Sequence, residues 1–66
     1  MKNNIKVERA KKNWTQGDLA EKIGISRQSA NSIEIGKFIP STVLALKMAK
    51  IFGTSVESIF QLEKQD

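Results

Sequence analysis

The chain has 66 residues, a formal net charge of +4, and neither cysteine nor histidine. This length holds one domain with one small core and leaves no room for a separate catalytic domain. The missing residue types exclude disulfides, thiolate nucleophiles, zinc-finger ligands and the usual histidine base, so we expect no enzyme activity, no metal and no cofactor. Charges interrupt every apolar stretch, and we therefore expect a soluble, cytoplasmic chain without a membrane segment.

The positive charge is unevenly distributed along the chain. Residues 1–40 hold eight of the basic side chains and four of the acidic ones, whereas residues 41–66 hold three of each. The whole excess therefore lies in the N-terminal part, where a phosphate backbone would attract it. Many small domains also carry surplus lysines for solubility, so charge supports nucleic-acid binding without deciding it.

A first helix is predicted over residues 4–12. Asn3 or Asn4 can cap it, and its apolar edge is weak, consisting of Ile5, Val7 and Ala10 with Trp14 just beyond the helix. We interpret Trp14 as a core residue between the first two helices rather than as a platform on which bases stack.

Residues 15–36 have the pattern of a helix-turn-helix. Thr15 can cap a second helix together with the acid three residues further on, and that helix ends near residue 23. Gly24 can adopt the positive φ that ends a helix, and Ser26 can then cap a third helix of about nine residues, 27–35. Small and apolar residues bracket the turn and are expected to hold the two helices at a steep angle: Leu19, Ala20, Ile23, Ile25, Ala30 and Ile33.

A fourth helix is predicted over residues 42–52. Pro40 discourages helix at the residue before it, and Ser41 can cap the helix that follows. Its apolar residues are too many for one narrow stripe, so we expect this helix to be central and the most buried of the five.

The C-terminal residues predict a short helix and a brief strand. Thr54 or Ser55 can cap a final helix that reaches residue 60. Residues 60–64 then alternate between apolar and polar, which is typical of a strand, and this strand is placed to pair with residues 1–3.

The order of these motifs resembles the lambda-repressor/Cro-like, or XRE, family of helix-turn-helix regulators over roughly residues 4–62. The matching elements are Thr15-Gln16, Leu19-Ala20, Gly24, Ser26-Arg27-Gln28, Ile33-Glu34, Gly36-Lys37, Pro40-Ser41 and Ser58-Ile59-Phe60. The short length and the start of the third helix most resemble a subgroup of minimal regulators of the cytolysin-repressor type, whose members act as homodimers. The resemblance implies an all-α fold, a five-helix lambda-repressor-like DNA-binding domain spanning residues 1–66. The small two-stranded sheet between the termini is expected from the alternation of residues 60–64 instead. It also implies an ion pair between Glu34 and Arg9 of the first helix.

In such a fold the third helix lies in the major groove of DNA and reads base edges. The residues on its exposed polar face, and hence the expected base readers, are Arg27, Gln28, Asn31 and Ser32. Gln28 suits adenine, and Arg27 suits guanine or a phosphate. Contacts to the DNA backbone are expected from Gln16, Gly17, Ser26, Ser29 and Lys37. Gln16 is placed either to bond a phosphate or to brace Gln28. A polar face of this kind can also be merely solvated, but the turn beside it favours DNA reading.

The expected partners are double-stranded DNA and a second copy of the chain, with no small-molecule ligand. We expect the dimer to form through residues 54–64, with Val56, Phe60 and Leu62 at the interface and Ile59 in the monomer core. The predicted function is a sequence-specific repressor that occupies a promoter at an inverted repeat, with half-sites roughly 34–36 Å apart. Two alternatives remain open: an antitoxin that represses its own operon and binds a toxin, and a protein-interaction module that does not bind DNA.

Overall fold

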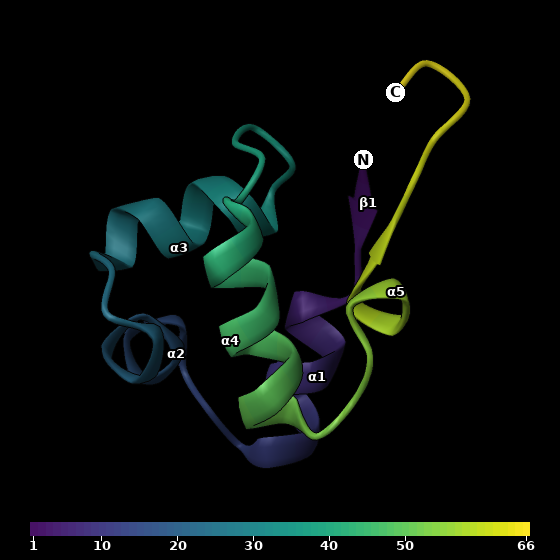
Figure 1. The fold of residues 1–66 in the computed structure, drawn as a ribbon. Helices are drawn as coiled ribbons and strands as arrows, with labels where there is room; N and C mark the ends of the chain where they lie inside the picture. The colour runs from purple at the N-terminus through teal and green to yellow at the C-terminus, as the bar shows by residue number, and fades with distance from the viewer.

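The computed structural model describes residues 1–66 and contains five α-helices and one two-stranded sheet (Figure 1). The elements in chain order are β1 (Lys2–Asn3), α1 (Ile5–Lys12), α2 (Gln16–Ile23), α3 (Arg27–Glu34), α4 (Thr42–Phe52), α5 (Val56–Ile59) and β2 (Phe60–Gln61). In Figure 1, α4 runs through the middle of the molecule, with α2 and α3 on one side of it and α1 and α5 on the other. None of the helices has the length and apolar character needed to cross a membrane.

One hydrophobic cluster holds the helices together. Every helix contributes at least one buried side chain to it, and its members are Ile5, Leu19, Ile23, Ile33, Met48, Phe52, Ile59 and Phe60. Trp14 packs against the edge of this cluster, where its ring stacks on the ring of Phe52 with centroids 5.6 Å apart. Trp14 therefore packs against the core, as expected, but the ring on which it stacks belongs to α4 rather than to either of the first two helices.

Helix α1 begins one residue later than predicted, and most of the apolar edge predicted for it does not face the core. The side chain of Asn4 caps nothing at this end, whereas Asn3 Oδ1 accepts a hydrogen bond from the N–H of Ile5. Ile5 is buried, but Val7 is 54% exposed and Ala10 is also exposed. At about 100° per residue, Val7 and Ala10 lie about 200° and 140° around the helix axis from Ile5, so they face away from the core.

Helices α2 and α3 form the predicted helix-turn-helix. Thr15 Oγ1 accepts from the N–H of Asp18 at 3.0 Å, while the N–H of Thr15 donates to Asp18 Oδ2 at 2.9 Å, which completes a capping box. Gly24 ends α2 with a φ of 75°. Ala20 and Ala30 are 4% and 1% exposed, so small buried side chains lie on both of the crossing helices.

Helix α4 has the predicted bounds, but it is not the most buried helix. Met48 and Phe52 are buried, whereas Val43 and Leu46 are 62% and 57% exposed. The apolar residues of α4 thus cover two surfaces. One faces the core, and the other faces solvent over the N-terminal half of the helix.

The short helix α5 is capped by Ser55 rather than Thr54, since Ser55 Oγ accepts from the N–H of Ser58. The sheet between the termini is present and antiparallel, with Lys2 opposite Gln61, although β2 is shorter than the predicted alternation. Ile59 is fully buried, as expected. Phe60 is only 8% exposed, so this expected interface residue lies mainly in the monomer core.

Candidate nucleic-acid interface

The outer face of α3 is polar and accessible. Arg27, Gln28 and Asn31 are exposed and Ser32 is partly buried, so the structure brings the four expected base readers onto one helix face. On the opposite face Ile33 is 1% exposed and packs into the core. The helix is therefore anchored on its inner side, and its outer side is available to a ligand.

The turn that begins α3 uses hydroxyl groups that we expected at the DNA backbone. Ser26 Oγ accepts from the N–H of Ser29 at 3.0 Å and donates to Ser29 Oγ at 2.9 Å. One hydroxyl therefore fixes the start of the helix, while the hydroxyl hydrogen of Ser29 stays available as a donor.

The N-terminus of α2 lies beside this face. In its first turn the N–H groups of Gln16 and Gly17 donate to no atom of the chain, because the capping box and the carbonyl of Thr15 satisfy only the next two. Free N–H groups at a helix N-terminus attract anions. A Cβ at Gly17 would have Thr15 Oγ1 as its nearest neighbour at 3.6 Å, so the fold itself does not require glycine there.

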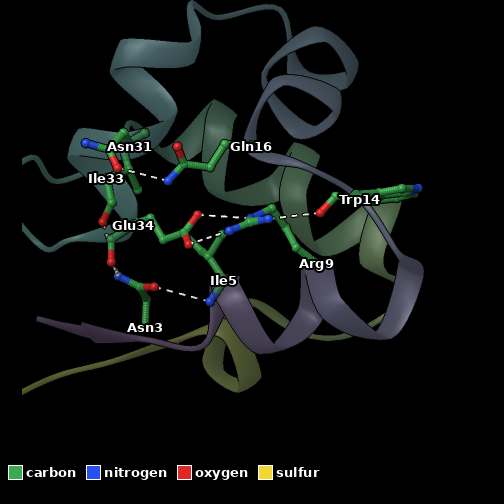
Figure 2. A network of polar contacts seen from close by, with 8 residues as sticks. All are labelled: Asn3, Ile5, Arg9, Trp14, Gln16, Asn31, Ile33 and Glu34. Atoms are coloured by element: carbon green, nitrogen blue, oxygen red, sulfur yellow. Dashed lines mark hydrogen bonds and ion pairs between the residues drawn. The ribbon is translucent and has the colours of Figure 1, made fainter.

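A side-chain bond joins the two helices at the interface. Gln16 Nε2 donates to Asn31 Oδ1 at 2.9 Å (Figure 2). We expected Gln16 to bond a phosphate or to brace Gln28, and the residue that it braces is Asn31. Asn31 is the predicted base reader that faces the start of α2, whereas Gln28 lies three residues earlier on α3.

A shallow hollow of 320 Å³ lies beside the polar outer face of α3. It is lined by Gln28, Ser29, Ser32, Lys37 and Phe38. The N–H groups of Lys37 and Phe38 both donate to the carbonyl of Ser32, at 2.9 and 3.1 Å, so the connector after α3 is fixed against the helix. Phe38 is 57% exposed and lines this hollow, although the sequence did not point to it as part of this surface.

The C-terminal end of α3 is held by a network from three other segments. Arg9 of α1 forms a two-bond ion pair with Glu34, through Nε to Oε2 at 3.0 Å and Nη2 to Oε1 at 2.7 Å. Nη1 of the same guanidinium donates to the carbonyl of Trp14 at 2.9 Å, and Asn3 Nδ2 donates to the carbonyls of Ile33 and Glu34 (Figure 2). The hydrogen bonds to Glu34 raise the pKa of Arg9 above its ordinary value. The ion pair that the family resemblance implied is thus present.

The basic groups at this interface are free of ion pairs. Arg27 and Lys37 are both exposed, and neither forms a salt bridge within the chain. Unpaired cations of this kind are suited to phosphate contacts. No group of three acidic side chains is placed to hold a metal ion.

Comparisons with known proteins agree with this geometry. A family model described as Helix-turn-helix matches residues 5–59. An uncharacterized HTH-type transcriptional regulator of Methanocaldococcus jannaschii is 52% identical over 66 residues, and YgzD of Bacillus subtilis, which carries the same description, is 41% identical; both alignments cover 100% of each chain. The crystal structure of a hypothetical transcription factor, NHTF from Neisseria, superimposes with a TM-score of 0.73 at 25% identity, covering 79% of this chain. This chain spans 58% of the Neisseria chain.

Two short helices joined by this turn, with a polar outer face on the second, define the class of helix-turn-helix DNA-binding proteins. The chain belongs to the helix-turn-helix family of transcriptional regulators, in its lambda-repressor/Cro-like, or XRE, branch.

Proposed function

We propose that the protein is a homodimeric repressor that binds an inverted-repeat operator and blocks transcription by occupying a promoter. The observation that carries the proposal is the exposed polar face of α3, a helix held by Ser26 at its start, by Gln16 at its middle and by Arg9 at its end. A helix held in this way presents its side chains in one geometry, so little order has to be gained on binding.

Within this proposal the side chains divide into base readers and backbone contacts. Gln28 forms two hydrogen bonds with adenine, Arg27 reads guanine or contacts a phosphate, and Asn31 and Ser32 complete the reading face. The free N–H groups of Gln16 and Gly17 contact a phosphate, as do Ser26, Ser29 and Lys37.

The proposal of a dimer is supported by an apolar surface beside α4 that is exposed to solvent. A hollow of 260 Å³ combines Ile39, Leu46, Val56 and Phe60, and Ile39 and Leu46 are 67% and 57% exposed. We propose that the dimer interface lies on this surface, with Val56 in its lining and Phe60 only at its base. Leu62, which is 82% exposed and does not line this hollow, remains a further predicted interface residue. The domain measures 31 × 23 × 20 Å, so two copies are large enough to hold their α3 helices one DNA turn, roughly 34 Å, apart.

The test is fluorescence anisotropy with promoter DNA from the protein's own locus across a salt series. We expect affinity to fall steeply with salt, and Gln28→Ala to cost about 1–3 kcal/mol on the preferred sequence while weakening sequence preference. Lys37→Ala is expected to reduce the salt slope by about one, because one phosphate contact is lost.

Lys50→Ala is the matched control, since Lys50 is an exposed lysine at the end of α4 that lies away from α3 in Figure 1. It is expected to leave the slope unchanged. Binding that is flat in salt and indifferent to Gln28→Ala would rule out the proposal.

A further inference from the structure

An exposed aromatic ring lies at the edge of the polar outer face of α3. Phe38 belongs to the connector of residues 35–41 that joins α3 to α4 in Figure 1, and 57% of its surface is exposed. It is not a member of the hydrophobic core, and it does not line the hollow of Ile39 and Leu46 where the dimer interface is proposed. Neither the core nor the proposed dimer interface therefore explains an aromatic side chain at this position.

The backbone of the connector holds Phe38 close to α3. The N–H groups of Lys37 and Phe38 both donate to the carbonyl of Ser32, and the N–H of the preceding Gly36 donates to the carbonyl of Ile33 at 3.0 Å. Three successive N–H groups are thus bonded to the last turn of the helix. The ring therefore starts from a backbone position that is fixed relative to the expected base readers on α3.

Phe38 is the one apolar residue in the wall of the 320 Å³ hollow beside that face. The other residues of the wall carry amide, hydroxyl or ammonium groups, and they are Gln28, Ser29, Ser32 and Lys37. A DNA duplex seated on α3 would therefore meet hydrogen-bonding groups and a single apolar surface in the same place.

The edges of the bases in the major groove have a matching composition. They present hydrogen-bond donors and acceptors, and the one apolar group among them is the C5-methyl of thymine. We propose that Phe38 is a specificity-determining residue whose ring contacts the methyl group of a thymine at or beside the base pair that Gln28 reads. This inference rests on the proposed function, because it concerns which base the DNA-bound protein selects.

Uracil in place of thymine isolates this contact. Uracil lacks the C5-methyl but keeps the O4 acceptor and the pairing with adenine, so the hydrogen bonds available in the major groove are unchanged. Cytosine is a less informative replacement, since it also exchanges an acceptor for a donor. The proposal therefore predicts that the protein distinguishes thymine from uracil at one position of each half-site.

The experiment begins with the selection of a preferred operator from a library of duplexes with a randomised core. Each thymine of that operator is then replaced singly by uracil, and the Kd of each duplex is measured by fluorescence anisotropy. For the wild type we expect one replacement per half-site to weaken binding roughly fourfold, the factor that corresponds to burial of one methyl group. For Phe38→Ala the same replacement should leave the Kd unchanged, and Phe38→Leu, which keeps an apolar side chain, should retain part of the loss.

Ile35→Ala is the matched control. Ile35 is 64% exposed at the C-terminal end of α3 but does not line the hollow, so this variant should respond to uracil as the wild type does. Phe38→Ala keeps the backbone N–H that bonds to Ser32, and circular dichroism checks that each variant is folded.

Each failure has its own signature. If Phe38→Ala weakens binding to thymine and uracil duplexes by the same factor, the ring contacts the sugar-phosphate backbone, and the inference is overturned. It is also overturned if Phe38→Ala changes neither Kd, or if the wild type responds to no uracil replacement. In these cases salt-dependent, sequence-specific binding still stands. If the wild type selects no sequence and its binding does not depend on salt, the proposed function fails and the inference fails with it.

Discussion

Arg9 shows how one side chain sets the position of a helix to which it does not belong. Its guanidinium joins α1 to Glu34 on α3 and to the carbonyl of Trp14 in the turn before α2. The side chains of Arg9 and Glu34 are only 14% and 8% exposed, so water solvates neither charge well and each charge depends on the other for stabilisation. Removing one partner therefore leaves the other charge partly buried and unpaired, and the resulting loss of stability is the quantity to measure.

We predict that Arg9→Met destabilises the fold by about 3 kcal/mol, because it leaves the Glu34 carboxylate partly buried and unpaired. The double variant Arg9→Met/Glu34→Leu should recover much of this loss, since both charges are then gone. Urea denaturation of the two single variants and the double variant measures the coupling.

The pair of Lys11 with Glu8 provides the control. Its nitrogen and oxygen are 3.1 Å apart, but the Lys11 side chain is 64% exposed, so Lys11→Met should cost less than 1 kcal/mol. Equal losses for Arg9→Met and Lys11→Met would show that burial does not govern the two pairs.

At the scale of single residues the sequence predicted the direction in which side chains point better than the hydrogen-bond partners that they find. The phase of α3 follows from its buried residues, so the outward direction of Gln28 and Asn31 could be derived from Ala30 and Ile33. The partner of Gln16 could not, because Gln28 and Asn31 both lie on the outer face of α3. Which of them meets α2 depends on the angle at which the helices cross.

At the scale of elements the helix starts are set by short-range hydrogen bonds. Thr15, Ser26, Ser41 and Ser55 each accept a bond from the N–H three residues further on. Such bonds can be predicted because they need only local sequence. The exposure of α4 could not be predicted in this way, since it depends on how many neighbours cover the helix.

The capping box of α2 gives a prediction for acid stability. The N–H of Thr15 donates to the Asp18 carboxylate, and this bond first, with the Thr15 side chain and the nearby Lys22 charge, holds the pKa of Asp18 below its ordinary 3.8. A depressed pKa in the folded state means that the contribution to stability is present above pH 3.8 and disappears as pH falls through the lower folded value.

We therefore expect Asp18→Asn to lower the melting temperature at pH 6 and to have a smaller effect near pH 2, where the wild-type carboxyl is also protonated. Thermal unfolding followed by circular dichroism between pH 2 and 6 measures this. Glu21→Gln is the matched control, because Glu21 is an exposed acid of the same helix outside the capping box. A gap between wild type and Asp18→Asn that stays constant over this range would contradict the prediction.

At the scale of the whole molecule the fold joins its two ends and leaves one apolar surface open. Residues 1 and 60 lie on the same hollow as Ile39 and Leu46, because the pairing of β1 with β2 brings the termini beside the N-terminal half of α4. The sequence predicted this sheet from a short alternation. It did not predict that the connector after α3 would contribute to the same surface, since that contact joins segments distant in sequence.

A domain of this size without disulfides has little burial to spare, so covering the open surface should add stability as well as symmetry. We predict that Leu46→Glu converts a dimer of the 7.4 kDa chain into a monomer, because a carboxylate would have to be buried against the second copy. Light scattering after size exclusion measures the mass. The wild-type melting temperature should rise with protein concentration, whereas that of Leu46→Glu should not.

Val7→Glu separates this effect from a general loss of surface hydrophobicity. Val7 is 54% exposed, close to the 57% of Leu46, but it lies on α1 and does not line the hollow. Val7→Glu should leave both the mass and the concentration dependence of the melting temperature unchanged.

If Leu46→Glu remained dimeric, the second copy would have to be held elsewhere, and the spacing between the two α3 helices would no longer follow from this surface. Because one α3 reads only half of an inverted repeat, a monomeric Leu46→Glu should also lose affinity for the full operator while keeping its base preference on a half-site.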